Sequence, residues 1–133
     1  MSRFIYHCPV RWSDLDAYGH VNNSRLLTLY EEARVALFFV GARAKGLTSF
    51  EEGIVIARHE VDYLRPVPYR QQVRIEMWVD EIRTARIGIR YELFDEDVLA
   101  SRARSVAVPY DLAAQRLRRV TDAEREFLTA WLE

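Results

Sequence analysis

Apolar residues recur with the period of a helix between residues 22 and 40. They form one stripe at intervals of three or four positions, which consists of Leu26, Tyr30, Ala33, Leu37 and Val40. This spacing predicts a long helix with a buried face. From Val35 to Val40 the residues are apolar all round, which predicts burial on every side. In a chain this short, only a sheet that curls around the helix could supply that much cover.

Most of the remaining chain alternates between apolar and polar residues, as half-buried strands do. Strands are predicted over residues 4–12, 54–64, 73–79, 87–93 and 98–110. Trp12 is expected on the same face of the first strand as Phe4, and Pro9 predicts an unpaired side there because proline cannot donate to a ladder. One face of the second strand is expected to carry Val55, Ala57, His59, Val61 and Tyr63.

A capping box at Thr121–Glu124 predicts a short C-terminal helix that extends to about Leu132. The order is therefore one strand, a long helix, four strands and a short helix. One long helix against one antiparallel five-stranded sheet is an α+β architecture. We expect residues 1–133 to form a single domain of this kind.

Composition narrows the class of protein. Half of the 133 residues are hydrophobic and the formal net charge is −1, so no electrostatic case exists for binding nucleic acid or an anionic membrane. No apolar run has the length of a signal peptide or a membrane span. Cys8 is the single cysteine, which excludes an intrachain disulfide. A cytoplasmic protein is the simplest interpretation.

The chemistry concentrates just before the long helix. Residues 14–23 contain two aspartates, a glycine, a histidine and two adjacent asparagines. Asparagine is a good N-cap, so the helix should begin near Asn22 or Asn23. Its free N–H groups and positive dipole end would then face the loop that carries Asp16. A carboxylate beside an anion-stabilising helix end suits chemistry at a carbonyl group.

The same residues carry a family resemblance. The pattern D-x-D-x-x-G-H-V-N-N at positions 14–23, followed by Y-E-E-A-R at 30–34 and D-Y-L-R-P at 62–66, resembles the hotdog-fold acyl-CoA thioesterases, within the 4-hydroxybenzoyl-CoA thioesterase-like group. The resemblance implies a hotdog fold, with a sheet wrapped around the long helix. It implies a hydrolase that cleaves an acyl-CoA or acyl-carrier thioester to free acid and thiol without a cofactor. It also implies a homodimer or homotetramer with active sites at the subunit interface.

Site residues follow from the motif positions. Asp16 would act as nucleophile or general base, the backbone N–H of Asn23 would stabilise the oxyanion, and Gly19 would allow close approach of the backbone. His20 would either shuttle a proton or orient Asp16. Asp14 is favoured as a loop residue that hydrogen-bonds backbone.

Other polar residues receive more ordinary roles. Glu31 and Glu32 are expected to be solvated or ion-paired on the helix, and His59 to be a hydrogen-bonded core residue rather than a catalyst. The histidines and Cys8 lack metal-ligand spacing, so no metal is predicted. Arginines would bind the phosphates of coenzyme A. We assign Arg83 and Arg86 from a candidate set of Arg65, Arg83, Arg86, Arg90, Arg116, Arg118 and Arg119.

Two alternatives to hydrolysis stay open. A hotdog enoyl-thioester hydratase or dehydratase would give His20 the leading role and release no free thiol. A non-catalytic acyl-CoA-binding module would keep the fold without turnover. One departure from the family pattern bears on the substrate: Leu26 and Leu29 stand where relatives often carry tyrosine, which favours aliphatic acyl groups.

Overall fold

The computed structural model describes residues 2–133 and is built around one 22-residue helical rod. The rod begins as α1 (Asn23–Val35), continues through a π-helical stretch, η2 (Ala36–Gly41), and ends as α2 (Ala42–Ala44). Asn22 caps it, because its side-chain oxygen accepts a 2.8 Å hydrogen bond from the N–H of Ser24. The predicted helix start is confirmed, whereas the π-helical stretch was not predicted.

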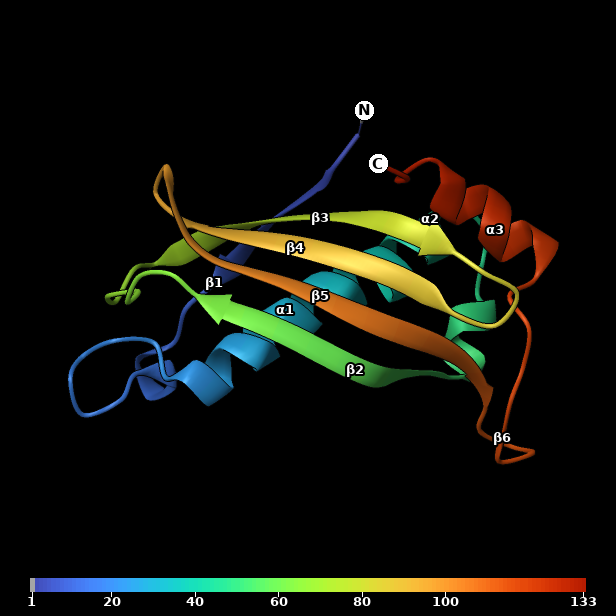
Figure 1. Ribbon diagram of the computed structural model, residues 1–133, viewed down its shortest axis with the longest axis horizontal. Coiled ribbons are helices and arrows are strands. Elements are labelled where there is room, and N and C mark those ends of the chain that lie inside the picture. The colour runs from blue at the N-terminus through green and yellow to red at the C-terminus, as the bar shows by residue number, and fades with distance from the viewer. Residues whose placement is uncertain (1) are drawn as a thin grey trace.

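An antiparallel sheet curls over one side of this rod (Figure 1). Its spatial order is β1-β3-β4-β5-β2, with a short β6 paired to β5. The strands are β1 (Phe4–Pro9), β2 (Ile54–Tyr63), β3 (Gln72–Ile82), β4 (Ile87–Asp95), β5 (Val98–Asp111) and β6 (Arg116–Leu117). A C-terminal helix, α3 (Asp122–Thr129), packs near the end of β3. The predicted α+β class and its five main strands are confirmed.

The core lies between the rod and the sheet. The side chains of α1 that are buried in this core are those of Leu26, Leu29, Tyr30 and Ala33. The facing side of β5 is lined by small residues, which lets the helix approach closely. There the Tyr30 hydroxyl donates a 2.7 Å hydrogen bond to the hydroxyl of Ser101, so the buried phenol is satisfied.

The prediction that the helix is buried on every side is wrong within one chain. Val40 is 65% exposed and Val35 is 37% exposed, because the sheet ends at β1 and β2 and covers only one side of the rod. Phe39 and Val40, together with Val35 and Val55, border adjoining hollows on the uncovered side. We call these four residues the apolar strip.

Two strands differ from the predicted pattern. β1 ends at Pro9 and, among residues 2–133, pairs only with β3, so the predicted unpaired side is confirmed there. Trp12, however, lies in a 3-10 turn (Trp12–Asp14) and is 82% exposed. In β2 the ladder shifts register between Ile56 and Arg58. This bulge reverses the alternation, so that Ile56 packs on the core and Val55 faces outward.

The predicted capping box at the start of α3 is confirmed and belongs to a larger buried network. The Glu124 carboxylate accepts hydrogen bonds from the backbone N–H of Thr121 at 2.9 Å, the guanidinium of Arg118 at 2.8 and 2.9 Å, and the hydroxyl of Ser49 at 2.6 Å. Glu124 is fully buried. This single carboxylate therefore joins α3 to the chain segments before β2 and after β6.

Candidate active site

The loop between β1 and α1 holds Asp16 by hydrogen bonds to its own backbone. One carboxylate oxygen accepts from the N–H groups of Tyr18 at 2.9 Å and His20 at 3.2 Å. The main chain closes the same turn, since the Asp16 N–H donates to the His20 carbonyl at 2.8 Å. Gly19 adopts φ +77°, a left-handed conformation that glycine takes without strain. The turn therefore fixes Asp16 close to Asn23, the first residue of α1.

Asp14 has a structural role, as favoured from the sequence. It is fully buried, and its carboxylate accepts hydrogen bonds from the backbone N–H of Arg11 at 2.8 Å and from its guanidinium at 2.9 Å. Burial opposes ionisation of Asp14, but the hydrogen bonds from Arg11 outweigh it and hold the pKa of the carboxyl below its ordinary value. The Asp14 carbonyl also accepts the N–H of Asn22, which ties the loop to the cap of α1.

Asp16 lines a cleft of about 470 Å³, which lies between the loop, the first turn of α1 and the segment that follows β2. His20, Asn23 and Leu26 line the same cleft. The cap engages the N–H of Ser24, and within residues 2–133 no hydrogen bond occupies the N–H of Asn23. The Asp16 carboxylate and the backbone N–H of Asn23, which has no hydrogen-bond partner among residues 2–133, thus line the same cleft. Gly19 contributes by allowing the tight turn of the loop that carries Asp16.

The opposite wall comes from the end of β2 and was not assigned from the sequence. Tyr63 lines the cleft, and its hydroxyl donates a 3.1 Å hydrogen bond to the Asn23 carbonyl. Arg65 lines the cleft as well. The D-Y-L-R-P motif was visible in the sequence, but no local pattern indicates that it meets residues 40 positions earlier.

The two arginines assigned to substrate lie elsewhere in the chain. Arg83 and Arg86 stand in the hairpin between β3 and β4, where the Arg83 N–H donates to the Arg86 carbonyl at 2.8 Å. Figure 1 places this hairpin at the end of the sheet away from the Asp16 loop. Arg83 forms an ion pair with Glu81. One chain therefore does not bring these arginines to the cleft.

The remaining candidate residues lie outside the cleft. His59 forms the expected hydrogen bond, 2.7 Å between its Nδ1 and the Ser105 hydroxyl, but it is exposed on β2 rather than in the core. Glu31 is exposed on α1, as expected. Cys8 is buried, and burial raises the pKa of its thiol to about 12, so it is no nucleophile at neutral pH.

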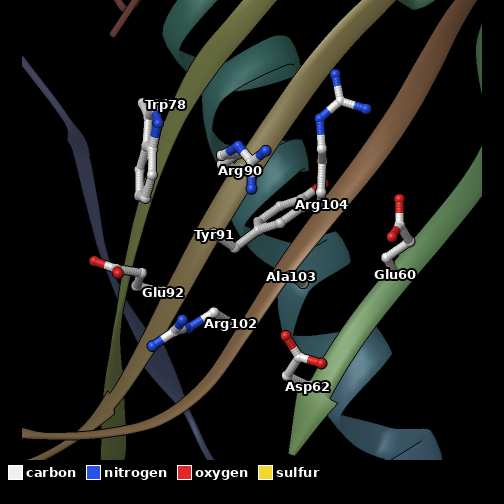
Figure 2. A pocket seen from close by; sticks show the side chains of 9 residues that line it. All are labelled: Glu60, Asp62, Trp78, Arg90, Tyr91, Glu92, Arg102, Ala103 and Arg104. Atoms are coloured by element: carbon white, nitrogen blue, oxygen red, sulfur yellow. The ribbon is translucent and has the colours of Figure 1, made fainter.

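A second hollow, of about 340 Å³, lies on the face of the sheet turned away from α1 (Figure 2). Both carboxylates and guanidinium groups line this hollow, and two of the guanidinium groups are already paired: the Asp80 carboxylate beside the hollow lies 2.7 Å from that of Arg90 and 2.8 Å from that of Arg104. A Cβ on Gly88 would overlap the Asp80 carboxylate, so the glycine makes room for this pair. The hollow contains no arrangement that resembles the Asp16 cleft.

Metal-ligating side chains do not cluster in the described part of the chain. No group of three or more histidine, cysteine, aspartate or glutamate residues within it could hold a metal ion. Among residues 2–133, no helix is long and apolar enough to cross a membrane.

Comparison with known proteins decides the family. Residues 10–132 match the model of the thioesterase-like superfamily. The chain belongs to this superfamily. It is a thioester hydrolase with the hotdog fold that the motif implied.

Individual relatives of this thioesterase-like chain agree with the assignment. A 1,4-dihydroxy-2-naphthoyl-CoA hydrolase of Gloeothece citriformis is 29% identical over 93% of the chain and 98% of its own length. A thioesterase of Thermus thermophilus, solved with coenzyme A and Zn, is 28% identical with a TM-score of 0.81, over 96% of this chain and 92% of its own. The uncharacterized protein YsmA of Bacillus subtilis is 28% identical over 66% of this chain, and that match spans 58% of its length.

Proposed function

We propose that this thioesterase hydrolyses an acyl-CoA or acyl-carrier thioester to a free acid and a thiol, with Asp16 and the first turn of α1 as the reacting site. The observation that carries the proposal is their position on one cleft. The names of two relatives support it, since one is a hydrolase of an aromatic acyl-CoA and another was solved with coenzyme A.

Two routes could use this geometry, and the first activates water. Asp16 takes a proton from water as the water oxygen bonds to the thioester carbon, and the carbonyl electron pair moves onto the oxygen. The N–H of Asn23 donates to that oxyanion, and one such donor typically lowers the barrier by about 3–4 kcal/mol. The carbon–sulfur bond then breaks and the leaving thiolate takes the proton. In the nucleophilic route the Asp16 carboxylate bonds to the carbon, and the carbon–sulfur bond breaks to release the thiolate, which takes a proton from solvent. Water then cleaves the resulting anhydride to the free acid and the Asp16 carboxylate.

Release of free thiol from a panel of acyl-CoA substrates tests this function. The wild-type protein should release thiol and should prefer aliphatic acyl groups, because Leu26, at a position where relatives often carry tyrosine, lines the cleft. Faster hydrolysis of benzoyl-CoA than of every fatty acyl-CoA would refute that preference. Hydration of an enoyl-CoA without thiol release would instead identify a hydratase. Binding of acyl-CoA with neither reaction would identify a non-catalytic module.

We also propose that the chain forms at least a homodimer through the apolar strip and the edge of β2. β2 pairs only with β5, which leaves its other edge without a partner strand among residues 2–133. The strip lies beside that edge, and exposed apolar surface next to an unpaired strand favours association with another copy. Such an assembly would place the cleft near a subunit interface, since Tyr63 at the end of β2 lines it.

If the apolar strip is the dimer interface, a charged residue placed in it should weaken association of the two chains. In sedimentation velocity the wild-type protein should have a mass of at least twice the 15.6 kDa of one chain. The Val40→Glu variant should sediment mainly as the monomer. Ile5→Glu is a matched control, because Ile5 is 45% exposed and lies on β1, the edge strand of the sheet opposite β2. A monomeric wild-type protein, or equal effects of both substitutions, would contradict this interface.

A further inference from the structure

Arg65 is the arginine that lines the Asp16 cleft among residues 2–133. Its backbone is fixed, because the N–H groups of Leu64 and Arg65 both donate to the Ala100 carbonyl, at 2.9 and 3.0 Å. Pro66 follows and restricts the chain further. The segment therefore holds the start of a long side chain at a defined place on the cleft wall.

The guanidinium at the end of that side chain is uncommitted. Arg11, Arg83, Arg90 and Arg104 all pair with carboxylates within 4.0 Å. No carboxylate of residues 2–133 lies that close to the guanidinium of Arg65, and no hydrogen bond from it is found there. Because Arg65 is also exposed, its five N–H donors are open to a ligand.

The charges of the cleft fit a substrate with one neutral end and one anionic end. Asp16 provides negative charge at the wall formed by the loop, and Arg65 provides positive charge at the wall formed by the segment after β2. A neutral thioester carbonyl can lie beside Asp16 and Asn23, whereas a phosphate would be repelled there. The same phosphate would be attracted to Arg65, whose planar fork matches phosphate oxygens.

We propose that Arg65 binds a phosphate group of the carrier arm and so fixes the direction in which the thioester enters the cleft. This proposal rests on the proposed thioesterase function. Arg65 then contacts substrate without taking part in bond making, so its loss acts on substrate binding rather than on the chemical step. Both coenzyme A and protein-bound phosphopantetheine carry such a phosphate, and rates of hydrolysis of the same acyl group from coenzyme A and from an acyl carrier protein separate the two sources.

The test uses one acyl group on three carriers: coenzyme A, 4′-phosphopantetheine and pantetheine, which has no phosphate. Arg65→Ala should raise KM at least tenfold for the two phosphorylated substrates, with kcat nearly unchanged, and should leave KM for acyl-pantetheine unaltered. An equal rise in KM for both would assign Arg65 to the phosphate of the arm, as proposed, whereas a rise for acyl-CoA alone would place the contact on the nucleotide phosphates and overturn the proposal. Arg102→Ala, which removes an exposed arginine on the outer face of the sheet, should change none of the three.

Other outcomes would overturn the proposal. An equal rise in KM on all three substrates would mean that Arg65 only supports the local structure, and no rise on any would mean that it does not touch the carrier. If the wild-type protein releases no thiol from any substrate, the proposed function fails on its own. Arg65 is then tested by calorimetric binding of coenzyme A, where Arg65→Ala should weaken affinity at least tenfold.

Discussion

Replacing Asp16 with asparagine is expected to lower kcat for thioester hydrolysis by about 10²–10⁴-fold. Asparagine has nearly the same shape and keeps an oxygen that can accept the N–H groups of Tyr18 and His20, so the loop should retain its form. It cannot accept a proton from water or attack the thioester as a carboxylate does. The loss should therefore fall on the chemical step, measured as thiol release under saturating acyl-CoA.

The control for Asp16→Asn separates chemistry from folding. Asp97→Asn changes an aspartate whose side chain is 98% exposed in the turn between β4 and β5, and it should leave kcat within twofold of wild type. The melting temperatures of both variants should match the wild-type value within a few degrees. Retention of more than a fifth of wild-type kcat by Asp16→Asn would remove Asp16 from the mechanism.

Replacing Glu124 with alanine is expected to lower the free energy of unfolding by about 3 kcal/mol or more. The substitution removes every hydrogen bond to the buried carboxylate and leaves the Arg118 guanidinium, 20% exposed, without its partner. It also removes half of the capping box on α3. Urea unfolding at pH 7 measures the loss, and Glu126→Ala, an exposed glutamate on the same helix, should cost less than about 0.5 kcal/mol.

The same carboxylate predicts how stability depends on pH. Burial opposes ionisation of Glu124, but hydrogen bonds from Arg118, Ser49 and Thr121 outweigh it and hold its pKa below the ordinary value of 4.5. A lowered folded-state pKa contributes stability that is fully present above pH 4.5 and is lost as the pH falls through the lowered value. The difference between wild type and Glu124→Ala should therefore narrow on acidification below pH 4.5. A constant difference from about pH 7 to about pH 3 would contradict this role.

The part of the candidate site that precedes and begins α1 could be predicted from the sequence, because its residues are neighbours along the chain. Asp16, Gly19, His20 and Asn23 lie within eight positions, and the cap at Asn22 specifies where α1 starts. A turn followed by a capped helix is built from local hydrogen bonds. The carboxylate and the first helical turn therefore had to lie near each other before any tertiary contact was known.

The spacing of apolar residues predicted which segments are helices and which are strands, and this pattern too depends only on residues that are close in sequence. Spacing of three or four residues identified the long helix, and alternation identified the strands, since both periods follow from backbone geometry. The bulge in β2 escaped this reasoning. One extra residue reverses which face each later side chain occupies, and only the pairing with β5 reveals where it was inserted.

Only the tertiary structure decided which distant segments complete the cleft and which faces stay open. The end of β2 and the segment after it place Tyr63 and Arg65 on the same cleft as Asp16. The hairpin between β3 and β4, which carries Arg83 and Arg86, lies at the other end of the sheet (Figure 1). The apolar end of the rod predicted complete burial, yet Val40 stays exposed because the sheet ends at its edge strands. The physical reason is the sequence distance over which the interactions act. Helix and strand periods follow from contacts between residues that are close in sequence, whereas strand order and sheet edges depend on how distant elements pack around one core.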